Sequence, residues 1–345
     1  MADGKPTIPS TPEAPASTGE TAPTPAERPE SLSPLAQGFR RFRRNRPAVA
    51  GAIILATMLL TILISLPAAI VGRGDLGSRA DAGSEQGSLL DLDPEAEPDD
   101  PAQPPGLQGG LLGTDGLGRS VWQRMAYGGA LSLLMGFSAA AIAVVIGTSV
   151  GLLAGFVGGR LDALLMRFVD VLYGLPYVLM AALLMATLRE PFRAAFGFPD
   201  AVVFVAIGLL SWLTMARVVR AEVLSIRSRP FIEAATAAGI PAWRVMVAHL
   251  LPNLVSVIIV YAALVVPQAI LQESFLSFLG LGVGPENPTW GQLASEAVRE
   301  GFNSITLRYW WLTWPPCIAL ALTLLSLNFI GDGLRDAFDP RSERG

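Results

Sequence analysis

Long runs without a charged side chain constrain this chain more than any other feature. Residues 48–71 hold no Asp, Glu, Lys or Arg, and at about 1.5 Å per residue a helix of that length crosses a hydrocarbon layer of roughly 30 Å. Further apolar runs lie at about 129–157, 168–188, 201–216, 254–272 and 309–331. The sequence therefore predicts an all-α integral membrane protein with about six transmembrane helices.

The composition supports the membrane class and excludes several others. Only 16% of the 345 residues are charged, too few to cover a soluble globule of this size. A net charge of −4 gives no electrostatic reason for a nucleic-acid partner. Lys5, the only lysine, lies in a Pro/Ser/Thr-rich stretch, so the chain has no phosphate-loop or Schiff-base lysine. Cys317 is the only cysteine and His249 the only histidine, so the chain can form neither an internal disulfide nor a Cys/His zinc cluster. We expect no catalytic residues, no metal and no cofactor on this chain.

The apolar runs divide the chain into five parts. Residues 1–34 lack an apolar period and are expected to form a disordered cytoplasmic tail. Residues 35–72 combine a basic juxtamembrane segment with the first span, and residues 73–128 form a long, acidic extracytoplasmic loop. Residues 129–333 hold the other five spans, and residues 334–345 form a cytoplasmic C-terminus.

Arginines predict the orientation. With the amino terminus inside, the inner segments from Arg40 onward hold fifteen arginines and the outer segments eight, as the positive-inside rule requires. Both termini are then cytoplasmic. Five inner arginines precede the first span: Arg40, Arg41, Arg43, Arg44 and Arg46.

The inner segment at about 220–252 is too polar to cross a bilayer and too rich in alanine for a plain loop. We expect two short helices, Pro230–Ala238 and Ala242–Leu250, with a turn at Gly239–Ile240–Pro241. On the pattern alone, this segment is either an amphipathic connector on lipid headgroups or a rigid knob that fits a cleft on another protein.

Four ordered segments carry a resemblance to a known family. Glu233-Ala234-Ala235, then Gly239, His249 and Leu251-Pro252 resemble the EAA loop of ATP-binding-cassette importer permeases. The other three resemble motifs of the dipeptide/oligopeptide/nickel branch, its C-type permease most of all: Leu112–Ser120 (LGTDGLGRS), Ser277–Val283 with Pro288–Gly291 (SFLGLGV and PTWG), and Gly331–Arg341. The resemblance covers about residues 35–341. His249 and Ser120 depart from the general pattern, which has isoleucine and an acidic residue there.

The resemblance implies the type I importer permease architecture in a bacterial cytoplasmic (inner) membrane. It implies half of a translocation pathway for di- or oligopeptides or related small solutes. The implied partners are a second permease, two cytoplasmic subunits that bind ATP–Mg, an extracytoplasmic solute-binding protein and the lipid bilayer. The resemblance also implies that the EAA loop contacts the ATPase, through Glu233, Ala234, Ala235, Gly239, Leu251 and Pro252. The outer motif supplies Gly113, Thr114, Asp115, Gly118 and Arg119.

Three charges lie nearest the membrane interior, where ionisable groups are costly. Arg167 and Asp170 are three residues apart and are expected to pair on one helix face. Glu273, expected to be partly hydrated near the outer end of its span, either lines the translocation path or bonds to a neighbouring helix.

Two other function classes compete with the importer. A self-contained, ion-driven secondary transporter needs carboxylates midway through its spans, and only Glu273 approaches that position. A membrane enzyme would need a nucleophile–base pair or a metal set, which the residues do not offer. Gly147, Gly151 and Gly155 are expected to let helices pack closely, rather than to leave room for substrate.

Overall fold

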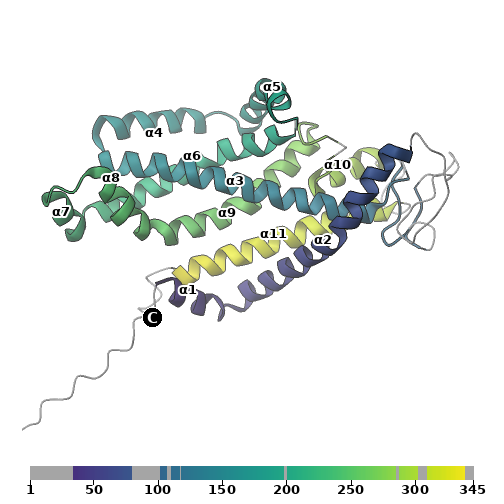
Figure 1. Cartoon of the computed structure of the whole chain (residues 1–345), viewed down its shortest axis with the longest axis horizontal. Helices are drawn as coiled ribbons and strands as arrows, with labels where there is room; N and C mark the ends of the chain where they lie inside the picture. The colour runs from purple at the N-terminus through teal and green to yellow at the C-terminus, as the bar shows by residue number, and fades with distance from the viewer. Residues whose placement is uncertain are drawn as a thin grey trace, which may run out of the picture.

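The computed structural model of the protein describes residues 34–79, 102–106, 110–116, 118–197, 200–284, 287–301 and 309–338. The predicted tail before residue 34, the acidic stretch Asp91–Asp100 and the end of the carboxyl-terminal motif lie outside the described residues. The regular elements in the described ranges are helices (Figure 1): α1 (Pro34–Phe42), α2 (Arg46–Arg79), α3 (Val121–Val157), α4 (Gly159–Tyr173), α5 (Tyr177–Phe196), α6 (Ala201–Arg227), α7 (Pro230–Ala237), α8 (Ala242–Val245), the π-helical turn η1 (Met246–Leu250), α9 (Leu251–Phe278), α10 (Trp290–Gly301) and α11 (Trp310–Phe338).

Five of these stretches are long and apolar enough to cross a membrane. They are α2 as far as Pro67, α3, α6, α11, and the stretch Ala242–Phe278, in which α8, η1 and α9 follow one another without a break. A sixth span results if the bent pair α4 and α5 is taken as one. The predicted all-α membrane fold with about six spans is therefore confirmed.

The predicted span at 168–188 is wrong as a single helix. Helix α4 ends at Tyr173, α5 begins at Tyr177, and the two helices are bent by 95°. Gly174 is a weak helix former, and Pro176 has no N–H to donate to the preceding turn. The chain therefore turns at Gly174–Leu175–Pro176.

Helix α3 occupies the centre of the bundle and packs along α6 and α9. A Cβ added at Gly147 would come within 2.6 Å of the Met215 side chain, and one at Gly151 within 2.6 Å of the Ala216 carbonyl. One at Gly155 would lie 2.8 Å from Val223. The predicted packing role of these glycines is confirmed, since only glycine lets α3 and α6 approach so closely.

Helices α2 and α11 lie side by side along the bundle (Figure 1). Close contacts again occur at glycines, since Gly51 faces the backbone of Ser326 and Gly333 faces Ala48. Most of the first span remains open to its surroundings: only 11% of its most apolar window is buried. A surface of this kind suits contact with lipid or with another membrane chain.

Ion pairs join α4 to α6. Asp170 accepts a hydrogen bond from Arg217 at 2.8 Å, and the Arg217 guanidinium lies 4.0 Å from the centre of the Tyr173 ring. The predicted pair between Arg167 and Asp170 is therefore wrong, because the facing helix supplies a better-placed cation. One turn further along α6, Arg220 binds both carboxylate oxygens of Asp162, at 2.5 and 2.7 Å.

The bundle has two distinct ends. Helices α7 and α8 lie at one end, with α1 and the end of α11 toward the same side, while α10 lies toward the opposite end (Figure 1). The motifs of the sequence fall at these ends, and they are described in turn.

Candidate functional site

The loop between α6 and α9, residues 228–252, folds as its sequence predicts in its first half. Pro230 occupies the first turn of α7, where its missing N–H costs nothing. The helix closes with two bonds typical of a Schellman motif, from the Gly239 N–H to the Thr236 carbonyl and from the Ile240 N–H to the Ala235 carbonyl. Gly239 has φ +77°. The predicted turn after α7 is confirmed.

The second half of the loop differs from the prediction of a separate helix ending at Leu250. Helix α8 runs through η1 into α9, and the Leu251 N–H bonds to the Met246 carbonyl five residues back. A proline inside a regular α-helix clashes with the carbonyl four residues before it. The wider turn of η1 ends two residues before Pro252 and lets the chain pass this residue without ending the helix.

Helix α7 is anchored by one face and displays the other. Ile232 is 1% exposed and packs with Val245, Leu250 and Leu254 in a cluster that also contains α6 residues. Glu233, Ala234, Gly239 and Pro252 are exposed, whereas Ala235 and Leu251 are half-buried. The display surface thus contains small residues and one carboxylate.

Large apolar side chains are exposed around α7 as well. Phe231 is 43% exposed, Trp243 60% and Val247 55%. The Arg244 guanidinium lies 5.4 Å from the centre of the Trp243 ring. His249 is half-buried, and its backbone carbonyl accepts a bond from the Asn253 amide at 2.7 Å. An apolar patch beside a rigid helix, at the bundle end, is the kind of surface that another protein covers.

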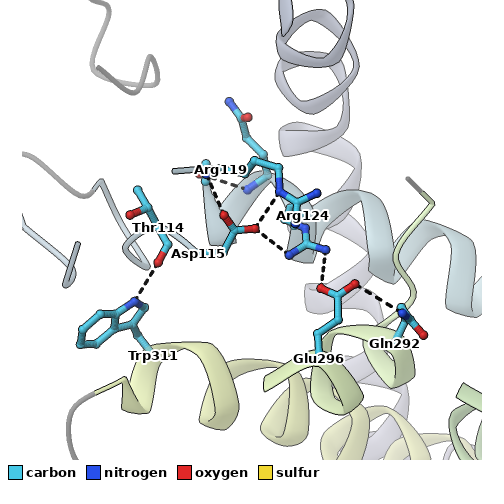
Figure 2. A network of polar contacts seen from close by, with 9 residues as sticks. Thr114, Asp115, Arg119, Arg124, Gln292, Glu296 and Trp311 are labelled. Carbon is cyan, nitrogen blue, oxygen red and sulfur yellow. Dashed lines mark hydrogen bonds and ion pairs between the residues drawn. The ribbon is translucent and has the colours of Figure 1, made fainter. Parts of the chain in front are cut away.

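The outer motif, Leu112–Ser120, forms a polar network with Arg124 of α3 and Glu296 of α10 (Figure 2). Asp115 is 4% exposed and accepts bonds from the Arg119 backbone N–H, from Arg119 Nε at 2.8 Å and from Arg124 at 2.8 Å. Arg124 also donates to Glu296 of α10 at 2.6 Å. The short loop that carries Asp115 is thereby fastened to α3 and α10.

Glycine and tryptophan position the backbone of the outer motif. Gly113 has φ +76°, and a Cβ there would lie 2.5 Å from the Gln103 carbonyl and 2.8 Å from the Trp311 ring. The Trp311 indole N–H donates to the Thr114 carbonyl at 3.1 Å. Gly118 has φ +73°. Ser120 caps α3 by accepting a bond from the Gln123 N–H, which gives this departure from the family pattern a structural role.

Glu273 is fully buried, so the expectation of partial hydration is wrong. Its Oε1 accepts bonds from Thr289 at 2.5 Å and from Ser277 at 2.7 Å. A Cβ added at Gly291 would lie 2.8 Å from its Oε2. The carboxylate ties α9 to the start of α10 in this structure; its predicted place in a translocation path stays a prediction.

The Pro288–Gly291 segment is built around this carboxylate. Thr289 binds Glu273, the Trp290 N–H donates to Ser132 Oγ at 3.0 Å, and the Trp290 indole donates to the Met125 carbonyl at 2.9 Å. The motif is recognisable in the sequence but its partners are not, because Ser132 and Met125 lie far away along the chain. In the described ranges, no three His, Cys, Asp or Glu side chains gather as a metal site would require.

Comparisons with known proteins match these features. Residues 147–344 match the family model of the binding-protein-dependent transport system inner membrane component. Residues 33–69 match the N-terminal transmembrane domain of oligopeptide transport permease C.

Individual proteins are similar over most of the chain. The oligopeptide transport system permease protein OppC of Haemophilus influenzae is 38% identical, over 88% of this chain and 87% of its own length. The dipeptide transport system permease protein DppC of Bacillus subtilis is 37% identical, over 91% of this chain and 88% of its own. OppC of Escherichia coli is 38% identical, over 88% of this chain and 89% of its own length.

Proposed function

Because the chain belongs to the family of binding-protein-dependent transport system inner membrane components, we propose that it forms half of the translocation pathway of an ATP-binding-cassette importer and couples it to ATP hydrolysis. The fold is that of type I importer permeases, and the chain is a multi-pass inner-membrane protein of the peptide-permease branch. The named systems of its relatives make di- or oligopeptides the proposed substrates.

The observation that carries the coupling role is the construction of α7. Buried Ile232 fixes the helix to the bundle, and the turn at Gly239 follows its end. Glu233 and Ala234 are exposed, as are the large side chains of Phe231 and Trp243. A partner cleft can approach such alanines closely, and an arginine in that cleft can pair with Glu233. Two cytoplasmic ATPase subunits holding ATP–Mg are the proposed partners at this end.

The opposite end is the proposed docking side of the solute-binding protein, where the outer motif is held by Arg124 and Trp311. A second permease would complete the pathway. The proposed orientation places both termini in the cytoplasm, and the position of α1 and the end of α11 toward the α7 side supports it (Figure 1). No observation favours the ion-driven secondary transporter, since Glu273 is buried and engaged with Thr289 and Ser277.

The test compares one charged bulky residue at two exposed alanines. Ala234→Arg places the charge on α7, and Ala163→Arg places it on α4; both alanines are exposed. The complex is purified in mild detergent, and the retained ATPase subunits are quantified. Uptake of a labelled tripeptide is then measured in vesicles with ATP on the ATPase side.

We expect Ala234→Arg to lose at least tenfold in retained ATPase and in uptake, while Ala163→Arg behaves as the unmodified chain. Equal effects at both positions would contradict the coupling role of α7. Uptake by the chain alone, driven by a proton gradient without ATP, would replace the proposal with the secondary transporter.

A further inference from the structure

We propose that α1 and the basic turn after it form a binding site for anionic phospholipid headgroups. The site comprises the exposed arginines Arg40, Arg43, Arg44 and Arg46, and we call it the α1 patch. It is separate from the α7 surface and from the outer motif. No step of the proposed transport cycle requires it.

Packing against α11 holds the α1 patch in place. Gly38 is buried, and a Cβ there would lie 2.6 Å from the Phe338 ring. On the same side of α1, the Phe42 ring lies against Gly333, 3.1 Å from where its Cβ would be. The arginines are therefore displayed on a fixed support, which lowers the entropic cost of binding.

The turn between α1 and α2 is also ordered. Asn45 accepts a bond from the Ala48 N–H at 3.2 Å, which caps α2, and its amide donates to Asp336 of α11 at 3.1 Å. The Arg43 and Arg44 N–H groups bond back to the Phe39 and Arg41 carbonyls. Four cationic side chains thus leave the end of α1, this turn and the start of α2, a short segment of defined shape.

The charge of the α1 patch is unbalanced. Elsewhere in the described ranges, three arginines at helix contacts meet carboxylates: Arg124 meets Asp115 and Glu296, Arg217 meets Asp170, and Arg220 meets Asp162. No such pair with a described carboxylate involves the four arginines of the α1 patch. Clustered guanidinium groups are well suited to phosphate, with which they form paired hydrogen bonds.

The apolar surroundings identify the phosphate as that of a lipid. Phe39 of α1 is 63% exposed between the arginines, and Ile53, on the adjoining part of α2, is 61% exposed. Arginines above an exposed aromatic ring and an apolar span match a headgroup with its acyl chains below it. Clusters of arginine next to a span attract anionic lipids by about 1 kcal/mol per residue. An acidic soluble protein would gain nothing from the apolar part of this surface.

The experiment measures lipid binding by the purified full chain in mild detergent. A fluorescent phosphatidylglycerol is titrated against the unmodified chain and against Arg40→Gln/Arg43→Gln/Arg44→Gln, with fluorescent phosphatidylcholine as the neutral probe. We expect the triple variant to bind phosphatidylglycerol about a hundredfold more weakly, from about fivefold per arginine. Phosphatidylcholine binding stays unchanged, and Arg→Lys substitutions at the same positions restore only part of the affinity, because lysine keeps the charge but not the paired hydrogen bonds.

The control is Arg160→Gln/Arg167→Gln, which removes two exposed arginines of α4. An equal loss per arginine in this control would reduce the α1 patch to general charge attraction and overturn the proposal. Unchanged binding in the triple glutamine variant would overturn it too, as would an acidic soluble protein that displaces the lipid. Thermal unfolding of each variant verifies folding. Because the assay contains neither ATPase nor peptide, its outcome is independent of the proposed transport function.

Discussion

Replacing Arg124 with Gln should loosen the outer motif. The Arg124 side chain is 12% exposed and bridges Asp115, at 2.8 Å, to Glu296, at 2.6 Å, and the side chains of these two residues are 5% and 18% exposed. Removing one partner of a buried ion pair costs about 3 to 5 kcal/mol, since the remaining charge stays buried. Asp115 keeps two donors from Arg119, and Glu296 keeps Gln292, so the lower limit applies.

The cost of about 3 kcal/mol corresponds to about a hundredfold faster local opening. The reporters are three backbone N–H groups of the motif, which bond to carbonyls in this structure: Thr114 to Gln103, Asp115 to Arg119 and Val121 to Gly113. Hydrogen–deuterium exchange of a peptide spanning 110–121, followed by mass spectrometry, measures their opening directly.

A second variant tests the cause. In Arg124→Gln/Glu296→Gln the buried charge on Glu296 is gone, so the double variant should exchange more slowly than Arg124→Gln alone. The control is Arg189→Gln, because Arg189 is 53% exposed and lies 3.7 Å from Asp200; an exposed cation contributes under about 1 kcal/mol. Exchange in Arg124→Gln within about threefold of the unmodified chain would refute the reasoning.

Two further changes test the other contacts. Thr289→Val removes the hydroxyl that donates to buried Glu273 while keeping the side-chain shape. We expect α10 to lose about 1 to 3 kcal/mol of local stability, measured as faster hydrogen exchange of its N–H groups. The control is Thr187→Val, because the Thr187 side chain is exposed and bonds within its own helix. No change relative to that control would mean that the Glu273 contact does not hold α10. Ile232 anchors α7 and is 1% exposed, so Ile232→Ala leaves a cavity beneath this helix. We expect the helix to lose about 2 to 4 kcal/mol of local stability, measured as faster proteolysis of the loop 228–252. Phe231 is 43% exposed, and Phe231→Ala should not reproduce this effect.

The sequence predicted those features that depend on local chemistry. Apolar runs predict spans whatever their neighbours are, and Gly239 followed by Pro241 ends a helix by backbone preference alone. The glycines of α3 are recognisable as packing residues because small side chains at a helical spacing have few other uses in a membrane.

Features that depend on which helices meet escaped the prediction. Asp170 pairs with Arg217 of α6 rather than with the nearby Arg167, and Arg124 pairs with Glu296, 172 residues away. Glu273 is covered by Thr289 and Gly291, so its burial depends on a loop that folds back over its own span. The bend between α4 and α5 could not be predicted, because Gly174 and Pro176 are compatible both with one kinked span and with two separate helices.

The continuous helix from Ala242 to Phe278 fixes a rotational phase between the two ends of the molecule. Each residue of an α-helix adds about 100° of rotation. If the segment that carries Thr289 stayed in place, inserting one residue between Leu251 and Glu273 would therefore turn the carboxylate away from Thr289. The π-turn at Met246–Leu250 contains one residue more than a regular turn would. Deleting a residue there would leave one regular turn and keep the loop 228–252 in phase with Glu273. Elsewhere in this helix, length changes should be tolerated only near whole numbers of turns, about seven residues at a time.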